Sequence, residues 1–204
     1  MRRNSLKVSV AALACAATIG TGCASEARKD SSAPAQVAAA EPVAGTATQP
    51  VAQNTTYYFV AYPENGRVYA MGDVKNWLLF SDHGEVPYTR TRIGAGPQGQ
   101  TVVFGITSDD VKANAPSVGE RIHDGQMQVD GAFYAEVVKD GRFHVFGEWK
   151  DFQDFLAHNE ITYTFTRIGT GPKGETVIYA LNRESSKQGA PVALIEKFEK
   201  LRNM

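Results

Sequence analysis

Hydrophobic and polar positions form the same pattern twice along the chain. Aromatic and β-branched runs at residues 57–62 and 67–71 flank Asn65-Gly66, and Asn-Gly between two such runs is a strong signal for a β-hairpin. The same arrangement returns around Asp140-Gly141, between the runs 133–138 and 142–146. We therefore expect one hairpin at the start of each half of the folded region.

A helical spacing of apolar residues follows each hairpin. Its members are Trp77 and Phe80 in the first half, and Trp149, Phe152, Phe155 and Leu156 in the second. Asp73 and Glu148 stand at the start of these segments, where a negative side chain suits the helix dipole. Residues 87–93 and 100–106 then read as two more strands around a glycine-rich turn. Each half is thus predicted to be ββαββ with antiparallel strands, which places the protein in the α+β class.

The two halves are also related in sequence. With an offset of 75 residues and no gap, residues 85–102 (EVPYTRTRIGAGPQGQTV) and 160–177 (EITYTFTRIGTGPKGETV) share 12 of 18 positions. This match indicates a duplication. Two independent small domains are one interpretation, but each half alone would bury only a modest core. We therefore expect one pseudo-symmetric domain.

Segment boundaries follow from this pattern. We assign repeat 1 to residues 57–108, a mostly polar connector to 109–131 with a short strand around 126–129, and repeat 2 to 132–188. Residues 189–204 are predicted to form a C-terminal helix, because a proline precedes an apolar stripe of Val192, Ile195, Phe198 and Leu201. This helix would cap the core or, alternatively, bind a partner.

The N-terminus has the features of an export signal. Arg2, Arg3 and Lys7 precede a short apolar stretch at 8–19, and small residues follow up to Cys23. The sequence Ile19-Gly-Thr-Gly-Cys23 resembles the lipobox of bacterial lipoproteins, which implies removal of residues 1–22 and lipid attachment at Cys23. Cleavage after Ala24 without a lipid is the alternative. The stretch beginning at Arg2-Arg3 also resembles a twin-arginine export motif, although the basic residues of a general secretory signal are the favoured explanation.

Residues 23–56 are predicted to be the lipid-attachment cysteine and a disordered linker. Residues 24–53 contain ten alanines and three prolines, and the first 56 residues hold no aromatic side chain, so this segment cannot form a core. Ala24 directly after Cys23 implies, through the lipoprotein resemblance, sorting to the outer membrane of a Gram-negative bacterium, facing the periplasm. A soluble periplasmic or secreted protein is the alternative.

Charge and composition exclude several function classes. A net charge of −1 argues against a nucleic-acid binder that relies on phosphate contacts. With Cys23 lipidated or removed, no thiol is left for nucleophilic catalysis or for a cysteine-based metal site. No G-x-S-x-G motif is present, and the turns Gly94–Gly99 and Gly169–Gly174 are followed by strands rather than by the helix that a phosphate loop needs. We expect no enzyme activity, cofactor or metal.

The repeat also pairs the candidate binding residues, which are Arg92 with Arg167, Tyr88 with Tyr163, and His83 with His158. An arginine beside a glycine turn can clamp a carboxylate or phosphate, or it can form an ion pair with a nearby glutamate, Glu85 or Glu160. The histidines stand at predicted helix ends, where they suit the dipole, and a metal site that also uses His123 or His144 is the alternative.

Residues 140–156 in the second half have a hairpin-then-helix pattern that resembles small metal-handling modules of the YHS and NosL type. The cysteine such modules use is absent, so the resemblance implies no ligand residue. Together these features predict an envelope protein that binds a partner protein or a cell-wall component. The alternative is a small-molecule or metal-ion carrier with its site between the two repeats.

Overall fold

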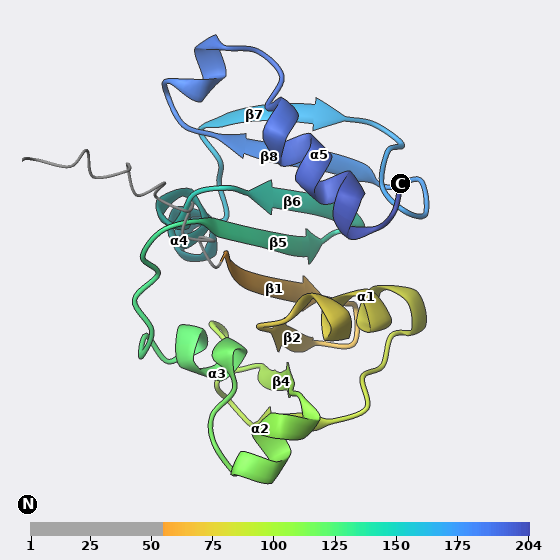
Figure 1. Ribbon diagram of the computed structural model, residues 1–204, viewed down its shortest axis with the longest axis vertical. Coiled ribbons are helices and arrows are strands. Elements are labelled where there is room, and N and C mark those ends of the chain that lie inside the picture. The colour runs from red at the N-terminus through yellow and green to blue at the C-terminus, as the bar shows by residue number, and fades with distance from the viewer. Residues whose placement is uncertain (1–54) are drawn as a thin grey trace, which may run out of the picture. The chain divides into compact units, whose positions relative to one another are not determined.

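A computed structural model describes residues 55–204, in which helices pack on a mixed β-sheet (Figure 1). It has one eight-stranded sheet and, within the described residues, five α-helices. The strands are β1 Thr56–Tyr62, β2 Arg67–Met71, β3 Thr89–Arg92, β4 Thr101–Gly105, β5 Phe133–Lys139, β6 Arg142–Phe146, β7 Tyr163–Arg167 and β8 Thr176–Leu181. The helices are α1 Val74–His83, α2 Ser108–Ala113, α3 Val118–His123, α4 Trp149–His158 and α5 Val192–Leu201, with a 3₁₀ turn at Ser185–Lys187.

The strand order in the sheet is β3-β4-β2-β1-β5-β6-β8-β7. The four pairs β1–β2, β3–β4, β5–β6 and β7–β8 are antiparallel, as the hairpin signals predict. The expectation of antiparallel strands throughout is wrong, because β2–β4, β6–β8 and the central pair β1–β5 are parallel. A helix lies between β2 and β4 and between β6 and β8, and such a crossover is long enough to bring the second strand back parallel to the first.

Helices cover both faces of the sheet. On one face, Trp77 of α1 and Phe198 of α5 pack in one cluster with Phe59 and Tyr134, and Figure 1 shows both helices in front of the sheet. On the other face, Ile122 of α3 and Phe152 of α4 belong to a second cluster that includes Tyr58, Val60 and Phe104. Strands buried on both sides explain why the central strands are almost uniformly apolar.

Local signals explain most of the helix and turn boundaries. Asp73 caps α1 by accepting a hydrogen bond from the amide of Asn76, and Gly84 ends the helix in the left-handed conformation. Glu148 stands at the corresponding position of α4 but makes no side-chain capping bond. Asp140 and Gly141 both have positive φ, as the two-residue turn of a hairpin requires.

The connector between the halves differs from expectation. Residues 126–129 form no strand, and the segment contains α2 and α3 instead. Each of these helices begins with a capping box, Thr107 with Asp110 and Ser117 with Glu120. Ser/Thr followed three residues later by an acid is a sequence signal for such a start, and the polarity of the segment concealed it.

Candidate functional site

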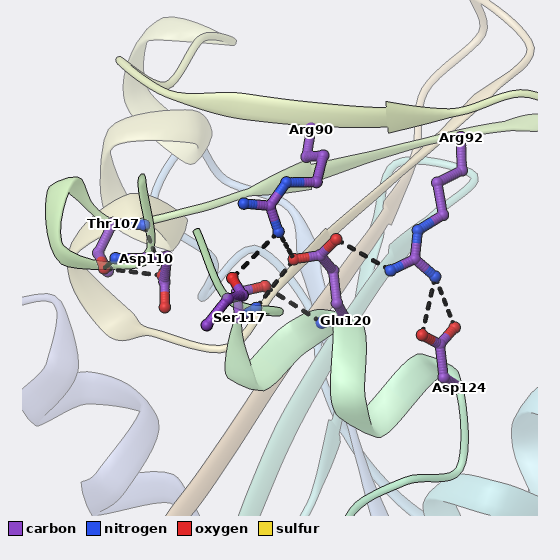
Figure 2. Close-up of polar contacts among 8 residues, drawn as sticks. Arg90, Arg92, Thr107, Asp110, Ser117, Glu120 and Asp124 are labelled. Carbon is purple, nitrogen blue, oxygen red and sulfur yellow. Dashed lines mark hydrogen bonds and ion pairs between the residues drawn. The ribbon is translucent and has the colours of Figure 1, made fainter. Parts of the chain in front are cut away.

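The two predicted arginines lie in ion pairs with the helices that follow their strands. Arg92 donates to both carboxylate oxygens of Asp124, at 2.7 and 2.8 Å, and to Glu120 at 2.9 Å. Its neighbour Arg90 donates to Glu120 at 2.6 Å (Figure 2). Arg167 donates to Glu199 of α5 at 2.6 Å. The prediction that Glu85 and Glu160 are the ion-pair partners is therefore wrong, because helices that come later in the chain, α3 and α5, bring other carboxylates over the strands.

Glu120 is the centre of the larger of these two clusters. Its side chain is 1% exposed and also accepts a hydrogen bond from the amide of Ser117, which closes the capping box of α3. Burial alone raises the pKa of Glu120, but the hydrogen bonds from Ser117 and Arg92, with the charge of Arg90, outweigh it and lower the pKa. The carboxylate thus stays ionised, and Arg90 and Arg92 are neutralised within the fold.

The other predicted site residues lie at the surface. Tyr88 is 47% and Tyr163 is 40% exposed, beside or in the outermost strands β3 and β7. His83 and His158 are the last residues of α1 and α4, as expected, and both are exposed. The structure does not bring these six side chains together. Cys23, the predicted lipid site, lies outside the described residues.

One of them, His158, lines a cleft between the two halves of the domain. The cleft has a volume of about 490 Å³, within the range of small-molecule sites. The first half contributes the β1–β2 turn and the Gly94–Gly99 turn, and the second half contributes the end of β5 and the last turn of α4. The lining residues are Tyr62, Pro63, Gly66, Arg67, Pro97, Gln98, Gln100, Lys139, Phe155, Leu156, Ala157, His158 and Asn159.

The charge of this cleft is one-sided. Arg67, Lys139 and His158 line it, and no aspartate or glutamate does. Lys139 is held by a 2.6 Å hydrogen bond to Oδ1 of Asn159 and lies 5.7 Å from the ring centre of Tyr62. Within residues 55–204, no carboxylate lies at ion-pair distance from Arg67 or Lys139. These two cations therefore differ from Arg90, Arg92 and Arg167, all of which are paired.

A smaller cavity of about 210 Å³ adjoins the cleft and shares Lys139, Phe155 and Asn159 with it. His144 and Arg142 line its remaining wall, together with Asp140. The Nδ1 atom of His144 is buried and has no hydrogen-bond partner among the described residues, and its ring stacks on Phe155 at 4.8 Å. Burial and the nearby charge of Arg142 lower the pKa of His144 to about 4, so its ring is neutral at pH 7.

A buried acid on β5 is the most constrained polar group of the domain. Glu136 accepts from the indole of Trp77 at 2.8 Å, from the hydroxyl of Tyr134 at 2.6 Å and from both terminal nitrogens of Arg202. These bonds tie α1 and the end of α5 to the central strands. Each carboxylate oxygen of Glu136 accepts two of these bonds, so the role of the cluster is to hold the fold together.

The sequence did not point to Arg67, Lys139 or Tyr62 as site residues, because they lie at the ends of hairpin strands where basic and aromatic residues are ordinary. No cluster of three or more metal-ligating side chains occurs in residues 55–204, and none of the helices there is long and apolar enough to span a membrane. No protein family matches the sequence, and comparison with curated proteins and with solved structures gave no significant match.

Proposed function

We propose that this protein is an exported, lipid-anchored binding protein that holds a small molecule in the cleft between its two halves. The observation that carries the proposal is the cleft itself, about 490 Å³ in volume and lined by polar groups from four separate segments. Such convergence of polar side chains in a concavity is the usual form of a ligand site. No nucleophile–base pair lies in its lining, which favours binding over catalysis.

We also infer that the two halves arose by duplication and are related by a pseudo-twofold axis along the strands. The pairings within β1–β4 correspond to those within β5–β8, in support of this proposal. From β2 onward, residues 75 apart also belong to opposite faces of the sheet. Val68 packs in the cluster of α3 and α4, whereas Phe143 packs in that of α1 and α5.

This symmetry gives the glycine turns a role. The Gly94–Gly99 turn lies beside the end of α4, and the Gly169–Gly174 turn lies beside the end of α1, where Nζ of Lys173 donates to the carbonyl of Ser81 at 2.6 Å. Each turn thus contacts the helix of the other half. A cavity also lies between the Gly169–Gly174 turn and α1, but it is smaller, about 330 Å³, and its lining includes Leu201–Met204 and the carboxylate of Asp82. We therefore place the ligand in the larger cleft.

Native mass spectrometry of the full chain, purified gently from its membrane, tests the binding function. A mass excess that disappears on denaturation, and that is lost in a variant with the cleft filled by Ala157→Trp, supports it. The unliganded mass alone, in both wild type and variant, would contradict retention of a small molecule.

Lipid anchoring is tested separately by labelling cells with radioactive palmitate. We expect incorporation into the wild type and none into Cys23→Ala, because the thiol of Cys23 would be the acceptor. Equal labelling of both proteins would remove the anchor from the proposal and leave the binding site untouched.

One observation favours a second function, the binding of a partner protein. Ile93 and Ile168 occupy the same position in the two halves, are 89% and 84% exposed, and make no packing contribution that would explain them. Each lies at the end of an outermost strand, and such strands have backbone groups available for pairing. Photo-crosslinking from these two positions in living cells would identify such a partner.

A further inference from the structure

We propose that the cleft ligand is a small organic anion, with a carboxylate or phosphate bound by Arg67 and Lys139 and an apolar body against the cleft wall. This inference rests on the proposed binding function and specifies its ligand class. It starts from the contrast between these two cations and three of the other strand arginines. Arg90, Arg92 and Arg167 have carboxylate partners, whereas within residues 55–204 the two cations of the cleft have none.

The balance of charge at the cleft is positive. The last turn of α4 lines it, and the carbonyl end of a helix carries about half a negative charge. Two full cations exceed that partial charge. The backbone N–H of Asn159 donates a hydrogen bond to the carbonyl of Phe155 at 2.7 Å, so this carbonyl of the last turn is already paired. Glu64, in the nearby β1–β2 turn, is not among the residues that line the cleft. An anion in the cleft therefore meets no carboxylate in its lining, and Asp140 lines only the adjoining cavity, where Arg142 offsets its charge.

The donors available to such a ligand are numerous. Lys139 uses one of its three N–H groups on Asn159, which leaves two for the ligand. The exposed guanidinium of Arg67 has the planar fork that binds a carboxylate or phosphate through two bonds. In the adjoining cavity, the buried Nδ1 of His144 has no partner in the described part of the chain. Buried polar atoms are nearly always hydrogen-bonded, so a ligand group reaching this cavity would complete the site.

The remaining wall is apolar. Pro63, Pro97 and Leu156 line the cleft beside the ring of Tyr62. Inorganic anions would leave this surface uncovered, whereas an anion with an aromatic or aliphatic body would bury it and gain affinity in proportion to the area removed from water.

The test is an NMR titration of the ¹⁵N-labelled full chain with phenyl phosphate, inorganic phosphate and phenol. We expect phenyl phosphate to shift the signals of the cleft residues and to bind at least about tenfold more tightly than either other probe, because each lacks one half of the recognition. Lys139→Gln should weaken phenyl phosphate binding by about tenfold or more through loss of a charge-assisted bond. Lys75→Gln, an exposed lysine on α1 across the sheet, is the matched control and should leave binding unchanged.

The outcomes separate the ligand class from the proposed function. If phenol binds in the cleft as tightly as phenyl phosphate, or if Lys139→Gln binds like the wild type, the cleft is a site but not one for anions. If none of the three probes shifts the cleft signals at about 10 mM, a concentration that populates even a weak site, the ligand class is overturned, whereas the binding function is decided by the mass-excess experiment alone.

Discussion

Replacing Arg202 by methionine tests how the C-terminal helix is held to the sheet. The guanidinium of Arg202 and the carboxylate of Glu136 are 5% and 0% exposed, so this ion pair is removed from water. Methionine keeps much of the apolar contact with Phe198 and Phe143, over which the guanidinium carbon lies at 4.0 and 5.0 Å. It leaves Glu136 buried, with only the bonds from Trp77 and Tyr134.

A buried charge that loses its partner typically destabilises a protein by about 3–5 kcal/mol. That is a large part of the 5–15 kcal/mol that separates most folded domains from their unfolded chains. We therefore expect urea unfolding of Arg202→Met at pH 7 to show a loss of about 3 kcal/mol or more. Arg183→Met, at an exposed position of the same half, is the control and should change stability by less than about 0.5 kcal/mol.

A second substitution separates the buried charge from the lost contacts. Glu136→Gln in the Arg202→Met background removes the carboxylate's charge, while its amide oxygen can still accept a hydrogen bond. The contacts of Arg202 with the aromatic rings are absent from both proteins, so their difference reports the charge alone. We expect the double variant to be more stable than Arg202→Met by at least about 1 kcal/mol. If the second substitution lowers stability further, the uncompensated carboxylate is not the cause of the loss.

Three further predictions concern other parts of the domain. Glu120→Ala should lower the free energy of unfolding in urea by about 2–3 kcal/mol, because it removes a buried carboxylate that accepts from three donors. Glu199→Ala, at a half-exposed ion pair, should lower it by less than about 1 kcal/mol. Equal losses would contradict the argument from burial. The pKa of His144 is 6.5 in the unfolded chain and about 4 in the folded protein, so the unfolded chain binds the proton first as the pH falls. Between these two pH values the wild type should lose about 2 kcal/mol of its free energy of unfolding relative to His144→Gln, after allowance for partial exposure. Parallel stability profiles of the two proteins against pH would refute the shift. Ile93→Ser with Ile168→Ser should leave the free energy of unfolding within about 0.5 kcal/mol of the wild type, since both side chains are exposed, and a larger loss would show that they pack.

Much of the local structure was readable from the sequence. The Asn-Gly and Asp-Gly turns located both hairpins, and Asp73 marked the start of α1, because turn and capping chemistry depends on residues close together in the chain. The apolar stripe after Pro191 likewise predicted α5. The helices of the connector were missed, although Ser117 and Glu120 carried a capping-box signal.

The candidate site was not readable in this way. Arg92 and Arg167 stood out because the repeat pairs them, yet their acids, Asp124 and Glu199, lie 32 residues further along the chain. His158 was singled out for its place at a helix end, and the structure finds it in a cleft with Lys139 and Arg67, which no motif indicated. Residues that become neighbours only through the order of the strands cannot be recognised from their spacing along the chain.

The sequence by itself determined the strands of the sheet, the turns, three of the helices that cover the sheet and the twofold recurrence of the pattern. These properties follow from periodicity and backbone preference, which act over a few residues. Only the tertiary structure decided that β1 lies parallel to β5, that each helix covers a particular face, and that the turn of one half lies beside the helix of the other. Those choices depend on which apolar faces can be buried together, and that is a property of the whole domain.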